Sequence, residues 1–137
     1  MVAATNLAWL SGIIDGEGCI TAHQNSIRSL GFRVTVESVS PVMFEKVTNI
    51  LQQCAVEHRT EGPMWRERST RPSRRVRVDK KQAVQRLCEL ILPYSVVKRA
   101  ELLLIKSYLD KAVMTYYSAT EEDLMILARL RELKKVA

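Results

Sequence analysis

The sequence predicts a single α+β domain in which helices cover one face of an antiparallel sheet. Three observations lead to this prediction: the length of 137 residues with 47% hydrophobic content, apolar residues at helical spacing, and short segments of strict alternation. A chain of this length can bury a core of its own, and nothing in it resembles a linker. We therefore expect residues 1–137 to form one domain in the order helix, strand pair, helix, strand pair, helix, followed by C-terminal helices.

Three helices are predicted before the C-terminal region, each with a polar residue that can cap it. The expected caps are Thr5 or Asn6, Ser40 followed by Pro41, and Asp79. The first helix should run to Ile14, and the third should end just before Pro93. Proline suits the first position of a helix because its missing N–H has no partner there in any case.

The strands are predicted from alternation between apolar and polar residues. One such segment alternates Phe32, Val34 and Val36 with Arg33, Thr35 and Glu37, and another alternates Val76 and Val78 with Arg75 and Arg77. The apolar side should pack on the helices, which leaves a polar and cationic side for solvent or a ligand. Residues 62–73 are expected to form a loop between two strands.

The C-terminal region is predicted to be helical and structural. Leu102, Ile105 and Leu109 recur at helical spacing. Thr120 and the three acids after it should begin a last helix, whose end carries Arg131, Lys134 and Lys135.

Positive charge is concentrated in one segment. Residues 59–81 hold nine Lys or Arg and three acids, so this segment accounts for the whole net charge of +6. A basic segment on an otherwise balanced chain is typical of a protein that binds a polyanion such as DNA, although an Arg-rich solvated loop would have the same composition. The three cysteines, Cys19, Cys54 and Cys88, are scattered and are interpreted as small core residues.

No apolar run is long enough to span a bilayer, and the N-terminus lacks a basic signal region. We therefore expect an intracellular protein, in the cytoplasm, the nucleoid or an organelle, with no membrane partner. An EF-hand, a dinucleotide fingerprint and a hydrolase triad are each unsupported by the spacing of glycines, acids and histidines.

Residues 10–18, Leu-Ser-Gly-Ile-Ile-Asp-Gly-Glu-Gly, resemble the LAGLIDADG motif that names a family of homing endonucleases. Five positions agree, and the four exchanges keep size class or charge. The expected order of helices and strands also resembles the αββαββα core of this family, over the chain to about residue 110. The resemblance implies a site-specific endonuclease that cleaves double-stranded DNA at a long pseudo-palindromic site and leaves short 3′ overhangs.

The same resemblance implies an active site. Glu17 would bind Mg²⁺ or another divalent cation through its carboxylate, and the carbonyl of Gly16 would be a second ligand. Lys98, in a segment that resembles the one following the third helix of the family, would be catalytic. Ser38 stands where the family often has Gln or Asn to order water, so it is expected to be a weaker member of the same site.

A single motif per chain implies a homodimer, with the partner contact made by the motif helix. The candidate contact residues are Trp9, Ser11, Gly12 and Asp15. The candidate DNA-binding residues on the predicted polar sheet face and in the basic segment are His23, Asn25, Arg33, Thr35, Arg59, Arg66, Arg68, Arg75 and Arg77.

Two alternatives use the same scaffold. A non-catalytic DNA-binding regulator would keep the acids only as helix-end and dimer-contact residues, and an RNA-splicing maturase would bind a different nucleic acid. The presence of both Glu17 and Lys98 favours the enzyme over the regulator, whereas nothing in the sequence excludes the maturase.

Overall fold

The computed structural model describes residues 2–113 and 117–136 of the chain. The elements are α1 (Ala4–Glu17), β1 (Gly18–Ser26), β2 (Ser29–Ser38), α2 (Pro41–Gln53), β3 (Arg59–Met64), β4 (Ser73–Val78), α3 (Lys81–Ile91), the 3₁₀ helix η1 (Leu92–Tyr94), α4 (Arg99–Ala112), α5 (Glu121–Leu124) and α6 (Ile126–Val136). This order confirms the predicted αββαββα core followed by C-terminal helices.

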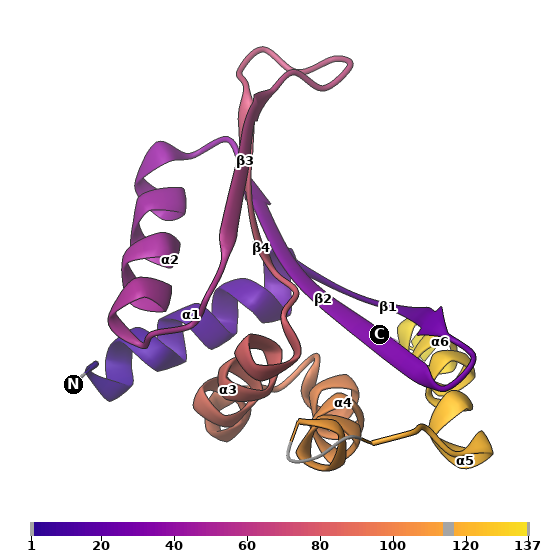
Figure 1. Cartoon of the computed structure of the whole chain (residues 1–137). Coiled ribbons are helices and arrows are strands. Elements are labelled where there is room, and N and C mark those ends of the chain that lie inside the picture. Colours follow the sequence, from indigo (N-terminus) through magenta and orange to yellow (C-terminus); the bar gives the residue numbers. More distant parts are fainter. Residues whose placement is uncertain (1, 114–116, 137) are drawn as a thin grey trace.

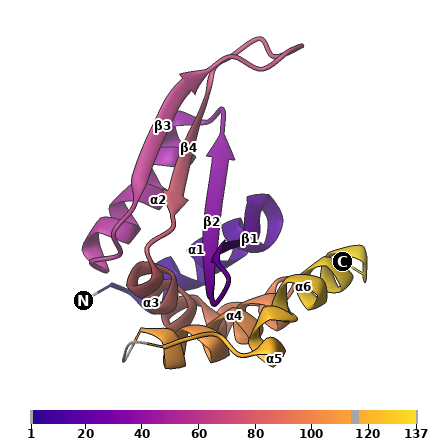
Figure 2. The same cartoon turned by 45° about the vertical axis from the view of Figure 1, so that its right-hand side comes forward.

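The four strands form one antiparallel sheet in the order β1-β2-β4-β3. Helices α1 to α4 lie on one side of this sheet, and the other side is uncovered (Figures 1 and 2). The loop between β3 and β4 projects beyond the sheet at the end remote from α4 (Figure 1). We call the uncovered side the outer face.

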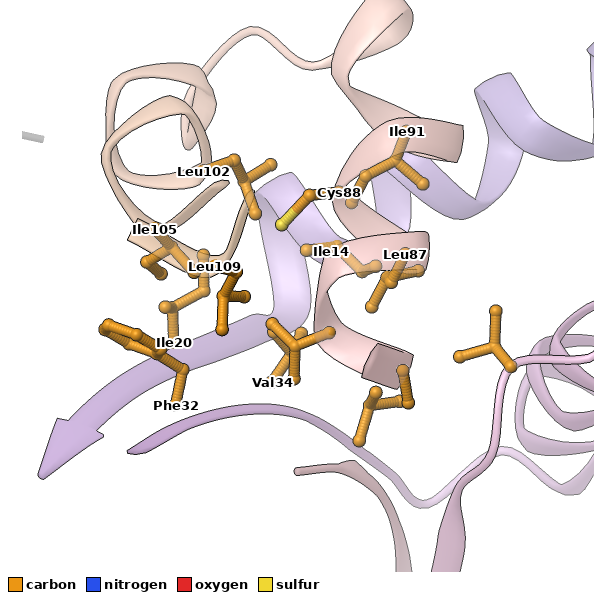
Figure 3. Packing of buried hydrophobic residues seen from close by; sticks show 14 of the residues in the cluster. Ile14, Ile20, Phe32, Val34, Leu87, Cys88, Ile91, Leu102, Ile105 and Leu109 are labelled. Atoms are coloured by element: carbon orange, nitrogen blue, oxygen red, sulfur yellow. The ribbon is translucent and has the colours of Figure 1, made fainter. Parts of the chain in front are cut away.

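The core lies between the sheet and the helices. Phe32, Val34 and Val36 of β2 are 6% exposed or less, while the residues between them are more exposed, so the predicted alternation is confirmed. Val76 and Val78 of β4 are buried in the same way. Residues from α1, α3 and α4 close the other side of the core, as Figure 3 shows for Ile14, Leu87, Cys88, Ile91, Leu102, Ile105 and Leu109.

One of the three predicted helix caps is confirmed and two are wrong. Ser40 caps α2, with its hydroxyl accepting a hydrogen bond from Met43 N at 3.2 Å and with Pro41 in the first turn. α1 instead begins at Ala4 and makes no side-chain cap, so Thr5 and Asn6 lie inside the helix. Lys80 rather than Asp79 precedes α3, because the carboxylate of Asp79 binds Arg59 on the neighbouring strand.

The predicted last helix is divided in two. Thr120 and Asp123 form a capping box at the start of α5, as the sequence suggested, but this helix ends at Leu124 and α6 begins at Ile126. One cysteine also differs from its prediction, since Cys54 and Cys88 are buried whereas Cys19 is exposed on β1. Among the described residues, no helix is both long and apolar enough to cross a bilayer.

Candidate active site and nucleic-acid interface

The motif helix ends in an exposed carboxylate at the edge of the sheet. Glu17 is the last residue of α1, and Gly18 begins β1 opposite Val36 of β2. The turn from helix to strand is so tight that a Cβ on Gly18 would lie 2.6 Å from the carbonyl oxygen of Ile14. Glycine is therefore required at this position, and the chain places Glu17 where helix and sheet meet.

Lys98 lies against the same helix end, although it is 83 positions from Asp15 in the sequence. Its ammonium group donates a hydrogen bond to the carbonyl oxygen of Asp15 at 2.8 Å. The Asp15 carboxylate in turn accepts from the backbone N–H groups of Val96 at 2.9 Å and Lys98 at 3.1 Å. These three bonds fix the segment before α4 to the last turn of α1, two residues before Glu17.

The helix end also offers backbone oxygen. The last four carbonyls of a helix lack intrahelical partners. Those of Ile14 and Asp15 accept from Gly18 N and Lys98 Nζ, respectively, and the carbonyl of Gly16 follows in the same turn. Within the part of the chain that the structure describes, no cluster of three or more His, Cys, Asp or Glu side chains is present. The described part of one chain therefore presents no group of three such side chains that could form a complete metal cage here.

Ser38 lies at the end of β2, on the same side of the strand as Val36. Its hydroxyl accepts a hydrogen bond from Ser40 N at 2.9 Å and so supports the turn that leads into α2. Its expected role in ordering water stays a prediction.

The outer face of the sheet carries the predicted polar and cationic residues. Cross-strand pairs in the register are Thr21 with Arg33, Thr35 with Arg77, and Arg77 with Arg59. On β1, His23 and Asn25 approach each other over Gly31 of β2, where a Cβ would lie 2.4 Å from Nε2 of His23. Hydrogen-bonding side chains are thus arrayed across all four strands on one surface.

Three acids accompany the arginines on the β3–β4 side of this face. The ion pairs are Glu37 with Arg66 and Arg75, Glu61 with Arg77, and Asp79 with Arg59. We did not predict these pairs from the sequence, although the alternation already placed Glu37 on the same side as Arg33 and Thr35. Because of them, the exposed positive charge of this surface is smaller than the count of arginines implies.

Arg66 differs most from its sequence-based interpretation. We expected it to lie in a loose loop, but its guanidinium makes two hydrogen bonds to Glu37, from Nε at 3.0 Å and from Nη2 at 2.5 Å. Arg33 is the opposite case, because among the described residues its buried Nε has no hydrogen-bond partner. Arg68 lies in the β3–β4 loop with a left-handed backbone (φ 68°).

Two of the four expected dimer-contact residues make hydrogen bonds within their own chain. Ser11 is fully buried and hydrogen-bonds to Ile91 O and Ser95 Oγ, and Asp15 binds the segment before α4. The place of both residues in the dimer contact therefore stays a prediction. Trp9 is half-buried beneath the ammonium group of Lys46, 4.4 Å from the ring centroid. Gly12 is exposed, and a Cβ there would have no atom within 4 Å, so it remains available to a partner.

No family model and no curated protein matches the sequence. Solved structures do match the fold. The homing endonuclease I-CvuI, in complex with its target in the presence of Ca, is 21% identical, with 95% of this chain and 82% of that chain covered and a TM-score of 0.67. The archaeal intron-encoded homing endonuclease I-Vdi141I, complexed with DNA, is 16% identical, with 97% and 84% covered and a TM-score of 0.67.

A third similar structure is that of the LAGLIDADG homing endonuclease I-SmaMI bound to cleaved DNA. It is 15% identical, with 96% of this chain and 47% of that chain covered and a TM-score of 0.62. The chain therefore has the α+β fold of the LAGLIDADG homing endonucleases, and the fold that residues 10–18 led us to expect is confirmed.

Proposed function

We propose that this protein is a homodimeric, metal-dependent endonuclease that cleaves double-stranded DNA at a specific pseudo-palindromic site. The observation that carries the proposal is the hydrogen bond of Lys98 to the carbonyl oxygen of Asp15, in the last turn of the helix that ends at Glu17, beside a sheet whose outer face is uncovered and rich in hydrogen-bonding side chains. An acid and a lysine brought together from distant parts of a chain beside a basic surface suit phosphodiester hydrolysis.

The oxygen donors at the end of α1 fit a hard divalent cation such as Mg²⁺, which is bound by a few carboxylates and keeps water and phosphate ligands. Glu17 would hold it through the carboxylate and Gly16 through the carbonyl. When bound, the cation would activate water and stabilise the leaving oxygen. Lys98, held beside Asp15, would stabilise negative charge at the scissile phosphate. Structures of I-CvuI were obtained in the presence of Ca and of Mg.

The dimer is proposed to form through the exposed side of α1. Ala8, Gly12 and Gly16 recur every four residues on this side and are all exposed. Small residues at this spacing let two helix backbones approach closely, and a two-fold axis between them would bring the second Glu17 to the first. The I-SmaMI chain is about twice as long as the part that this chain covers, as expected if one such chain does the work of two copies.

DNA would lie against the outer face of the sheet. A ribbon of strands fits the major groove, where Arg pairs with guanine and Asn or Gln with adenine. We expect bases to be read by side chains of β1 and β2, namely His23, Asn25, Arg33 and Thr35, and by side chains of β3 and β4, namely Arg59, Arg75 and Arg77. Arg66 and Arg68 lie in the loop that extends this surface.

A randomised duplex library tests the proposal. We expect the purified protein to cut a small subset of duplexes when Mg²⁺ is supplied, and sequencing of the ends should show short 3′ overhangs around a pseudo-palindrome. Glu17→Gln should select the same duplexes without cutting them. Selection without cutting by the wild type would instead indicate the non-catalytic regulator, and preference for RNA would indicate the maturase.

A further inference from the structure

Four hydrogen-bond donors converge on the carboxylate of Glu37. Besides the two from Arg66, Nη2 of Arg75 donates to Oε1 at 3.0 Å and the hydroxyl of Ser73 donates to Oε2 at 3.0 Å. The donors come from β4 and from the β3–β4 loop, while Glu37 belongs to β2. One carboxylate therefore ties the loop to two strands of the sheet.

This cluster is more enclosed than an ordinary surface ion pair. Ser73 is 3% exposed, and the side chains of Glu37 and Arg75 are about one third exposed. The hydrogen bonds from Arg66, together with those from Ser73 and Arg75, lower the pKa of Glu37 from its usual value to about 2, despite the opposing effect of burial. Glu37 thus stays charged at any pH at which the protein would bind DNA.

The position of the cluster connects it with the proposed site. β1 begins at Gly18 opposite Val36, so Glu37 is the next residue along β2, beside the end of α1 that carries Glu17. Glu37 also lies directly opposite Arg75 in the register, and Arg75 lies opposite Glu61. An acid here repels phosphate, which is unfavourable for binding DNA as such. Any benefit of this acid to DNA binding must therefore come from the side chains that it holds in place.

We propose that Glu37 is a specificity-determining residue that positions Arg66 and Arg75 on the outer face. The proposal rests on the DNA-binding function proposed above. Arginine on a loose loop contacts any phosphate within reach, and such contacts carry no sequence information. An arginine whose guanidinium is already fixed by a carboxylate can contact a base or phosphate in one position only. Such an arginine also loses less conformational freedom when DNA binds. Glu37 thus lowers affinity for random DNA and raises discrimination.

The test compares Glu37→Gln with Glu57→Gln. Glu57 forms an ion pair too, with Lys80 at 2.6 Å, near the ends of β3 and β4 that are remote from the loop. Both variants change the net charge equally, so a difference between them reports the position of the acid. A first readout needs no DNA: trypsin should cut after Arg66 faster in Glu37→Gln than in wild type or Glu57→Gln, because the guanidinium is no longer held.

The second readout is selection from a randomised duplex pool in Ca²⁺, followed by titration of selected and random duplexes over a salt series. We expect Glu37→Gln to bind random duplexes more tightly with a steeper salt dependence, and to lose about tenfold in discrimination, the size of one good base contact. Equal discrimination by Glu37→Gln and wild type would overturn the role of Glu37. If the wild-type protein bound no duplex, that result would overturn the proposed DNA-binding function and not only the role of Glu37.

Arg66→Ala keeps the proposal testable if Glu37→Gln fails to fold, because it removes the loop side of the cluster and leaves the sheet intact. If Glu37 positions Arg66 to contact DNA specifically, Arg66→Ala should discriminate less than the wild type between selected and random duplexes. If Arg66→Ala only lowers the salt dependence and leaves sequence preference unchanged, Arg66 is a simple phosphate contact and the proposal is wrong.

Discussion

The two sides of helix α1 differ in what their residues touch. On one side Leu10, Ser11 and Ile14 are 2% exposed or less and pack against the rest of the chain. On the other side Gly12 and Gly16 are exposed with no atom near the place where a Cβ would be. One side of the nine-residue motif therefore packs within the domain, and the other side is exposed, where we propose that a second copy binds and that Glu17 acts.

This difference teaches that matching a motif position by position does not assign a role to each position. Ser11 and Gly12 are neighbours, and both are small, which suits a close helix contact equally well. Only the direction in which each residue faces separates them, because Ser11 bonds to Ile91 and Ser95, whereas a Cβ on Gly12 would meet no described atom outside its own helix backbone within 4 Å. The predictions below test whether changes on the two sides of α1 have separate effects.

The largest expected effect is on the open side. Glu17→Gln should lower cleavage by about 10³-fold or more, because loss of the charge that would hold the cation removes several kcal/mol of transition-state stabilisation. The exposed side chain makes no contact that folding needs, so the melting temperature should not change. Cleavage of a selected duplex and thermal unfolding measure the two quantities, and wild-type cleavage by this variant would remove Glu17 from the active site.

On the packed side, Ser11→Leu should destabilise the monomer. The larger side chain would overpack a fully buried position, at a cost of about 1–3 kcal/mol, and the hydrogen bonds to Ile91 O at 3.3 Å and Ser95 Oγ at 3.1 Å would be lost. Urea unfolding measures the change, with Ser11→Ala as a control that removes only the hydroxyl. An unchanged free energy of unfolding for Ser11→Leu would show that this side of α1 is not closely packed.

Gly12→Leu, at the next position, should leave the monomer stable and weaken the proposed dimer. The monomer has room for the side chain, so its intrinsic stability should hold or rise slightly with the better helix former. The proposed dimer should dissociate, because overpacking a close contact costs about 1–3 kcal/mol or more. Sedimentation over a concentration series is the measurement. A dimer of unchanged affinity would place the partner contact on another surface.

The smallest expected effects concern the outer face of the sheet. There we expect arginines on the strands to contact base pairs and arginines in the β3–β4 loop to contact phosphates without sequence preference. Arg77 lies on a strand with its side chain 19% exposed and paired with Glu61, so Arg77→Ala should lower preference at particular base pairs by about 1–3 kcal/mol. Arg68, in the loop, should contact phosphate only. Arg68→Ala should weaken binding to all duplexes alike and lower the slope of log affinity against log salt by about one.

Titration of both variants against matched and mismatched duplexes over a salt series provides the measurement. A sequence preference that changes with Arg68→Ala and not with Arg77→Ala would move the reading surface from the strand to the loop.

Local patterns were enough to predict most of the fold. The alternation around Phe32 and Val34 and the Ser40-Pro41 start of α2 both depend on neighbouring residues, and both are confirmed. Asp79 was misjudged because a carboxylate before a helix has two possible partners, the first helical N–H groups and a nearby cation. Arg59 on the adjacent strand is the cation that it binds, and such a neighbour becomes apparent only once strand pairing is known.

The candidate site was predicted less completely, for the same reason. A resemblance in sequence suggested Glu17 and Lys98, whose roles stay predictions, and the structure brings the Lys98 segment against the last turn of α1. The pairing of Glu37 with Arg66 and Arg75 joins residues 29 and 38 positions apart and depends on the sheet register and on the course of the loop. Counting charges along the chain cannot show which arginines are already neutralised.

Asp15 has a consequence for how such a chain can diverge. Because its carboxylate accepts from the backbone N–H groups of Val96 and Lys98, the backbone of the lysine is tied directly to α1. Substitutions in α4, α5 and α6 that keep those helices folded should leave the lysine in place. An exchange at Asp15 should therefore displace the lysine even in a chain whose C-terminal helices and buried core residues are unchanged.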